Sequence, residues 1–179
     1  MTRYVALLGS INVGGNRLKM ADLRDALERE DFEGVETVVA SGNVLFDHEE
    51  RPSAGLAEKL AYVVREAFGF DTFAVVLNRF ELQAVLDENP FKDDGAENFV
   101  HVHFLEGQPE QAAFDKLIAD HASRGPERIA AGTRALHVDY VNGAGQTKLS
   151  GDFIARRLGH RHTARNIRSI RRIIEIMDR

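Results

Sequence analysis

The amino-acid sequence predicts an α+β protein whose antiparallel sheets are covered on one face by helices. Two kinds of segment alternate along the 179 residues. In one kind every second residue is apolar, which indicates a strand. In the other kind apolar residues recur at spacings of three and four, which indicates a helix. A short turn between two of the strands favours antiparallel pairing, because parallel neighbours need a long crossover connection.

The first half of the chain has the element order βαββαβ, which is typical of a ferredoxin-like fold. Strands are predicted at residues 4–8, 35–39, 44–46 and 73–77, and helices at residues 20–27 and 56–68. The second helix ends at Gly69, a residue that readily adopts the left-handed conformation of a helix C-terminus. Ser41-Gly42-Asn43 forms the turn between the second and third strands, since Gly and Asn tolerate a positive φ.

The second half of the chain repeats most of this order. A helical stretch ends before Pro90, because the residue before a proline avoids the helical region. Beyond it, strands are predicted at residues 99–105, 128–131 and 135–141, with a helix at residues 112–122 and two helices at the carboxy terminus. The order βαββα predicts a second ferredoxin-like subdomain that is incomplete, its last strand missing or replaced by the final helix. We place the boundary near the turn at residues 93–96, which gives subdomains of residues 1–90 and 91–179.

The composition excludes several classes of protein. With 44% hydrophobic and 28% charged residues, the chain can form a core and does not have the composition of a disordered segment. No apolar run approaches the roughly 20 residues of a membrane-spanning helix, and the apolar stretch at the amino terminus is too short for a signal peptide. The absence of cysteine excludes disulfides, thiolate metal sites and a cysteine nucleophile. We therefore expect a soluble, cytoplasmic protein with no membrane partner.

The formal net charge of −5 conceals an uneven distribution. Residues 146–179 contain nine basic and three acidic side chains, so this segment carries +6 and the rest of the chain −11. A cationic segment favours an anionic ligand such as nucleic acid or a phosphate. The alternative is that its arginines pair with the acidic part of the same protein. Phe153 is the one aromatic residue in this segment, which argues against single-strand recognition there.

Three groups of residues are candidates for binding an anion. Two glycine-containing loops, residues 9–16 and 142–148, each lead from a strand into a helix, where backbone N–H groups and the helix dipole attract negative charge. The third group is the last helix, which we expect to begin at Thr163 and to present a row of arginines. The predicted ligand-binding residues are Asn12, Gly14, Gly15, Ser41, Asn43, Lys148, Arg157, Arg165, Asn166 and Arg168. The alternative for the loops is that glycine serves only the backbone conformation.

Histidines in the second half allow a metal site. His101 and His103 are two residues apart on a predicted strand and therefore point to one side, a spacing compatible with metal ligation. The neighbouring strand carries His137 and Asp139, so four potential ligands could converge on the face opposite Val100, Val102 and Phe104. The alternative is that they are ordinary hydrogen-bonded residues. We expect no resident cofactor, and the sequence contains neither a G-x-S-x-G nor an H-E-x-x-H motif.

The chain resembles the bacterial family catalogued as domain of unknown function 1697. The matching segments are Arg3-Tyr4-Val5-Ala6-Leu7-Leu8, Ile11-Asn12-Val13-Gly14-Gly15, Lys19-Met20, Ser41-Gly42-Asn43-Val44, Asn89-Pro90-Phe91, Lys148-Leu149, Arg157-Leu158-Gly159 and Thr163-Ala164-Arg165-Asn166. The resemblance implies an α+β fold with a ferredoxin-like part and implies no established activity. The chain departs from the family at Gly9-Ser10, where members commonly have Arg-Gly, and at Ile167, where a tryptophan is common.

These observations lead to three hypotheses for the function. The first is a binding protein for an anionic ligand, either a phosphate-bearing small molecule or a nucleic acid. The second is an enzyme that acts on a phosphorylated small molecule, with a metal at His101, His103 and His137. The third is a structural protein that associates with itself as a homodimer through exposed sheet faces.

Overall fold

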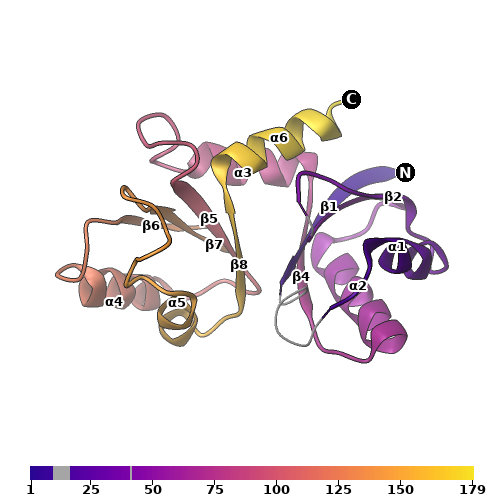
Figure 1. Cartoon of the computed structure of the whole chain (residues 1–179), viewed down its shortest axis with the longest axis horizontal. Helices are drawn as coiled ribbons and strands as arrows, with labels where there is room; N and C mark the ends of the chain where they lie inside the picture. The colour runs from indigo at the N-terminus through magenta and orange to yellow at the C-terminus, as the bar shows by residue number, and fades with distance from the viewer. Residues whose placement is uncertain (10–16, 41) are drawn as a thin grey trace. The chain divides into compact units, whose positions relative to one another are not determined.

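The computed structural model describes residues 1–9, 17–40 and 42–179. It divides into two compact units, one formed by Met1–Leu82 with Ile173–Arg179 and the other by Gln83–Arg172. Each unit contains one four-stranded antiparallel sheet with helices on one face (Figure 1). The predicted α+β class with two ferredoxin-like subdomains is therefore confirmed. The boundary between residues 90 and 91 stays a prediction.

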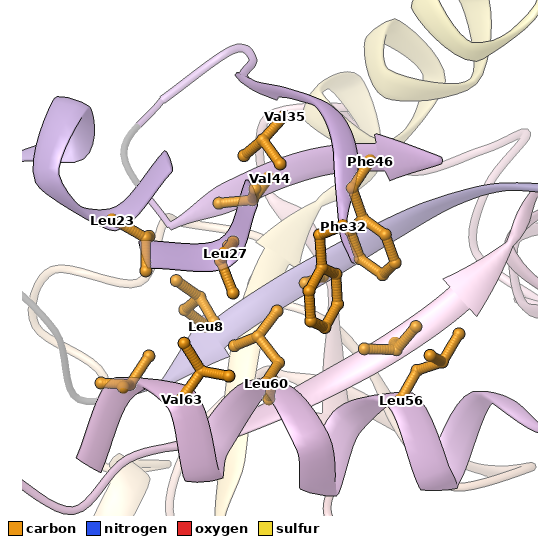
Figure 2. Packing of buried hydrophobic residues seen from close by; sticks show 14 of the residues in the cluster. Leu8, Leu23, Leu27, Phe32, Val35, Val44, Phe46, Leu56, Leu60 and Val63 are labelled. Atoms are coloured by element: carbon orange, nitrogen blue, oxygen red, sulfur yellow. The ribbon is translucent and has the colours of Figure 1, made fainter. Parts of the chain in front are cut away.

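The first unit has the predicted order of strands and helices. Its elements are β1 (Thr2–Gly9), α1 (Met20–Glu28), β2 (Glu33–Thr37), β3 (Asn43–His48), α2 (Ser53–Phe68) and β4 (Phe73–Asn78). The strands lie in the order β2-β3-β1-β4. Leu27 of α1 and Leu60 of α2 pack with Leu8 and Phe46 of the sheet, all at most 4% exposed (Figure 2). Gly69 ends α2 with a φ of 75°, as predicted from its lack of a Cβ.

The second unit has the same topology. Its elements, with the two helices that extend beyond it, are α3 (Arg79–Glu88), β5 (Val100–Leu105), α4 (Gln111–His121), β6 (Arg128–Gly132), β7 (Ala135–Asp139), α5 (Gly151–Leu158), β8 (His162–Asn166) and α6 (Ile167–Met177). The strand order β6-β7-β5-β8 repeats that of the first sheet. Phe114 and Leu117 of α4 and Ile154 of α5 pack on Leu136 and Val138 of β7, so α4 and α5 cover one face.

The strand β8 corrects two predictions. The second subdomain is complete, because residues 162–166 pair with β5 where we expected the strand to be missing. The last helix begins at Ile167 and not at Thr163. The sequence did not reveal this strand because all five residues of β8 are half-buried and only Ala164 is apolar, so the segment lacks the alternation that identifies a strand. Its pairing with β5, in which His103 lies opposite Ala164, comes from tertiary structure.

Within the ranges that the model describes, no helix has the length and apolar composition needed to cross a membrane.

Candidate functional site

A pocket of about 300 Å³ lies in the second unit, beside the loop that leads from β7 to α5. This volume is at the lower end of the range for small-molecule sites. The lining residues are Pro126, Glu127, Tyr140, Asn142, Gly143, Gly145, Gln146 and Thr147. The loop at residues 142–148, predicted from its glycines as an anion site, therefore forms one wall, and the segment before β6 contributes Glu127.

The backbone at one side of the pocket is strained. Val141, directly after Tyr140, has a φ of 56°, which is unfavourable for a β-branched residue. The Asn142 N–H donates to the Tyr140 carbonyl across this residue, and the Val141 N–H donates to Asp139 Oδ1 at 2.9 Å. Such strain costs on the order of 1–3 kcal/mol and concentrates at functional sites, where the surrounding structure holds it.

Glu127 supplies a negative charge to the pocket. Its side chain is 5% exposed and accepts hydrogen bonds from the Thr147 hydroxyl and, at 3.1 Å, from Nε2 of the buried His121. Burial acts to raise the pKa of Glu127, but the hydrogen bonds from Thr147, the backbone and His121 together outweigh it and lower the pKa below its ordinary value. The carboxylate is therefore ionised at neutral pH.

The side chains of Tyr140, His103 and His162 form a hydrogen-bonded chain on the sheet face covered by α4 and α5. The Tyr140 hydroxyl is 2.8 Å from His103 Nε2, and His103 Nδ1 is 3.1 Å from His162 Nδ1. His162 Nε2 lies 3.0 Å from the Gly151 carbonyl. Burial, with further contributions from the neighbouring imidazoles, lowers the pKa of His103 well below 6.5, so this ring is neutral at physiological pH.

The protons in this chain have one consistent arrangement when the imidazoles are neutral. The Gly151 carbonyl can only accept, so His162 carries its proton on Nε2 and accepts at Nδ1. His103 must then donate from Nδ1 and accept at Nε2. The Tyr140 hydroxyl consequently donates to His103, which leaves only acceptor capacity on its oxygen.

The candidate metal constellation is not formed, because strand register separates its members. His137 lies opposite Val102 in the β5–β7 pair, whereas His103 lies opposite Leu136. Residues that pair directly share a face, so His137 is on the face opposite to His101 and His103. Its Nε2 is 3.0 Å from Glu88 Oε1, and His101 Nδ1 is 3.1 Å from the Phe99 carbonyl. In the parts of the chain described, no group of three or more His, Asp or Glu side chains could hold a metal ion.

A basic cluster adjoins the pocket and includes two of the predicted binding residues. The guanidinium carbons of Arg124 and Arg157 lie 4.3 Å and 3.5 Å from the centroid of the Phe153 ring. Arg124 also donates to the Lys148 carbonyl at 3.3 Å, and Lys148 directly follows Thr147 of the pocket. We call Arg124, Lys148 and Arg157 the Phe153 cluster. Arg157 additionally donates to Asp120 at 3.0 Å.

The other predicted binding residues that the structure describes lie elsewhere. Arg165 is on β8 opposite Val102, hence on the far face of the sheet from α5, and burial lowers its pKa to about 10. Asn166 accepts from the Ser169 N–H at 2.8 Å and so caps α6. Arg168 is exposed on that helix. Asn43 is buried in β3, where its carbonyl accepts from the Val38 N–H. Asn12, Gly14, Gly15 and Ser41 lie outside the described residues.

Several arginines of the basic segment pair with acidic residues, as the alternative expectation states. Arg161 forms an ion pair with Glu106 at 2.6 Å, and Arg171 pairs with Glu97 at 3.2 Å. Sequence reasoning missed the residues that complete the pocket and the cluster: His121, Arg124, Glu127 and Tyr140. No motif identifies these residues: His121, Arg124 and Glu127 lie at the end of α4 and in its connection to β6, and Tyr140 follows β7.

Together these features define a class of α+β protein with two ferredoxin-like subdomains and a polar pocket on the second. The chain belongs to the family described as protein of unknown function, DUF1697, whose model matches residues 1–137. The matched span includes Glu127 and ends before Tyr140 and the loop at residues 142–148. The resemblance found in the sequence is thereby confirmed.

The fold has a counterpart among solved structures. The structure of a conserved bacterial protein from Streptococcus pneumoniae is 25% identical in sequence, with a TM-score of 0.70 over 100% of this chain and 99% of that one. None of the curated proteins compared with the chain matches it. The likeness supports the two-subdomain architecture along the whole chain.

Proposed function

We propose that this protein binds a small phosphate-bearing ligand at the Phe153 cluster. The observation that carries the proposal is that two guanidinium groups from separate segments, those of Arg124 and Arg157, lie against one aromatic ring, and that Arg124 also bonds the carbonyl of Lys148. Arginine presents a planar fork of donors that matches phosphate oxygens. Two guanidinium groups already held against a ring also lose less side-chain entropy when a ligand binds.

The size of the neighbouring pocket favours a small molecule over a nucleic acid. A pocket of about 300 Å³ accommodates a compact ligand, and its lining residue Thr147 directly precedes Lys148 of the cluster. The Phe153 ring is 7% exposed and in contact with two guanidinium groups, so it does not offer a face on which a base could stack.

The proposal is tested by calorimetric titration of the protein with inorganic pyrophosphate at low ionic strength. Arg124→Ala and Lys148→Ala each remove one charged contact, so we expect the dissociation constant to rise about tenfold. Arg156→Ala is the matched control, because Arg156 is an exposed residue of α5 adjacent to Arg157 and lies outside the cluster. It should leave the affinity unchanged.

Three outcomes contradict the proposal. The proposal is wrong if the wild-type protein does not bind pyrophosphate. It is also wrong if the three variants bind pyrophosphate equally well. A single-stranded oligonucleotide that binds more tightly than pyrophosphate, and loses affinity in the cluster variants, would replace the small ligand with a nucleic acid. Thermal unfolding of each variant checks that the fold is retained.

A further inference from the structure

The pocket and the Phe153 cluster have opposite charges. Of the lining residues, all of which the structure describes, Glu127 is the one with a charged side chain. Its hydrogen bonds come from a hydroxyl and an imidazole, and neither is a fixed cation such as a Lys or Arg side chain. A nearly buried carboxylate in this position is stabilised by a positive charge brought by a ligand.

Three residues that line the pocket, Glu127, Tyr140 and Thr147, carry hydrogen-bond acceptors. The Thr147 hydroxyl gives its proton to Glu127 and accepts from the Leu149 N–H at 3.0 Å. When the imidazoles of His103 and His162 are neutral, the Tyr140 hydroxyl gives its proton to His103. Glu127 has no proton to give. These three side-chain groups therefore present lone pairs beside the amide groups of Asn142 and Gln146, and a ligand group that bonds the three must supply the hydrogens.

We propose that the pocket selects, among phosphate-bearing ligands, those that also carry a primary ammonium group. The ammonium is bound by Glu127 and Tyr140, while the phosphate is bound by the Phe153 cluster. An ammonium group supplies both a positive charge and three donors, which matches the charge of Glu127 and the acceptor oxygens of Thr147 and Tyr140. The inference rests on the proposed function, since it names the class of ligand for the same site.

His121 connects the two ends of the site, because its Nε2 bonds Glu127 and its ring centroid lies 5.9 Å from that of Phe153. We therefore choose small probes. Phosphoethanolamine carries both charged groups on a short linker, and propyl phosphate has the same shape with a methyl group in place of the ammonium.

The experiment compares these two probes by calorimetric titration at pH 8, where the amine of phosphoethanolamine is charged. We expect phosphoethanolamine to bind wild-type protein about tenfold more tightly than propyl phosphate. Glu127→Gln keeps the side-chain shape and removes the charge, so the preference should fall to within about twofold. Asp120→Asn removes a carboxylate outside the pocket. It should shift both affinities together and keep the ratio.

The outcomes separate this inference from the proposed function. If neither probe binds, the phosphate site itself is wrong. If both bind wild-type protein equally, the phosphate site stands and the ammonium subsite is overturned. A preference that persists in Glu127→Gln also overturns it. Should Glu127→Gln fail to fold, Tyr140→Phe, which removes one acceptor oxygen, is expected to reduce the preference about threefold.

Discussion

Single residues in the second unit carry roles that depend on the protonation of their side chains. His103 is the central example, because both of its ring nitrogens have side-chain partners and the residue is 5% exposed. With neutral imidazoles it accepts from Tyr140 on one side and donates to His162 on the other. In that arrangement the Tyr140 oxygen has only acceptor capacity left for a further hydrogen bond.

Replacing His103 with an apolar residue tests the hydrogen-bonded chain formed by Tyr140, His103 and His162. In His103→Leu the Tyr140 hydroxyl and His162 Nδ1 both lose their partner, and each unsatisfied buried group costs about 1–3 kcal/mol. We expect the free energy of unfolding, measured in urea, to fall by about 2–4 kcal/mol. His101→Leu is the control, because His101 lies two residues away on the same face and bonds only a nearby carbonyl. An equal loss of unfolding free energy in the two variants would contradict a stabilising role of these hydrogen bonds.

At the scale of elements, the junction of β8 and α6 shows how a binding motif can be structural. Thr163-Ala164-Arg165-Asn166 was predicted to present ligand contacts from the first turn of a helix. The structure instead ends a strand at Asn166 and begins the helix one residue later. The Asn166 amide oxygen then accepts the Ser169 N–H, which would otherwise have no partner in the first turn.

The capping role leads to a prediction about stability and binding together. Asn166→Ala removes the acceptor at the helix start, so the free energy of unfolding should decrease by about 1 kcal/mol. Asn166→Asp keeps an oxygen in the same position and should retain most of the stability. Both should bind pyrophosphate as the wild type does. Weakened binding at unchanged thermal stability in Asn166→Ala would show that the residue serves a ligand.

For the whole molecule, the buried histidines make stability depend on pH. Burial lowers the pKa of His101, His103 and His137 relative to the unfolded chain. The unfolded state therefore binds more protons below its pKa of about 6.5. The stabilisation from neutral histidines is fully present above that pH and is lost as the pH falls. Each such proton contributes up to about 1.4 kcal/mol per pH unit.

Urea unfolding between pH 8 and pH 5 measures this dependence. The midpoint should be constant from pH 8 to about pH 7 and then decrease towards pH 5, before most carboxylates titrate. His103→Leu should show a shallower decrease, since one of the three groups is absent. A midpoint that stays level down to pH 5, or that rises, would contradict the burial of neutral histidines.

Much of the fold could be predicted from the chain because periodic apolar residues report directly on burial. In β1, for example, the apolar run of residues 4–8 is buried throughout, and Tyr4, Ala6 and Leu8 lie in the core of the first unit. The strand β8 could not be found in this way, because its burial comes from pairing with β5 and not from apolar side chains. Lys148 and Arg157 were identified as cations from the sequence, but Arg124 was not, since only the Phe153 ring connects it to Arg157.

The sequence by itself determined the α+β class, the repeated element order, the position of most strands and helices and the basic character of the carboxy-terminal segment. These properties depend on local spacing and composition. Only the tertiary structure decided which polar residues act together. Strand register separated His137 from His103, and tertiary packing brought Arg124 to Phe153 and Tyr140 to His103. Such contacts join residues distant in the chain, so no local pattern records them.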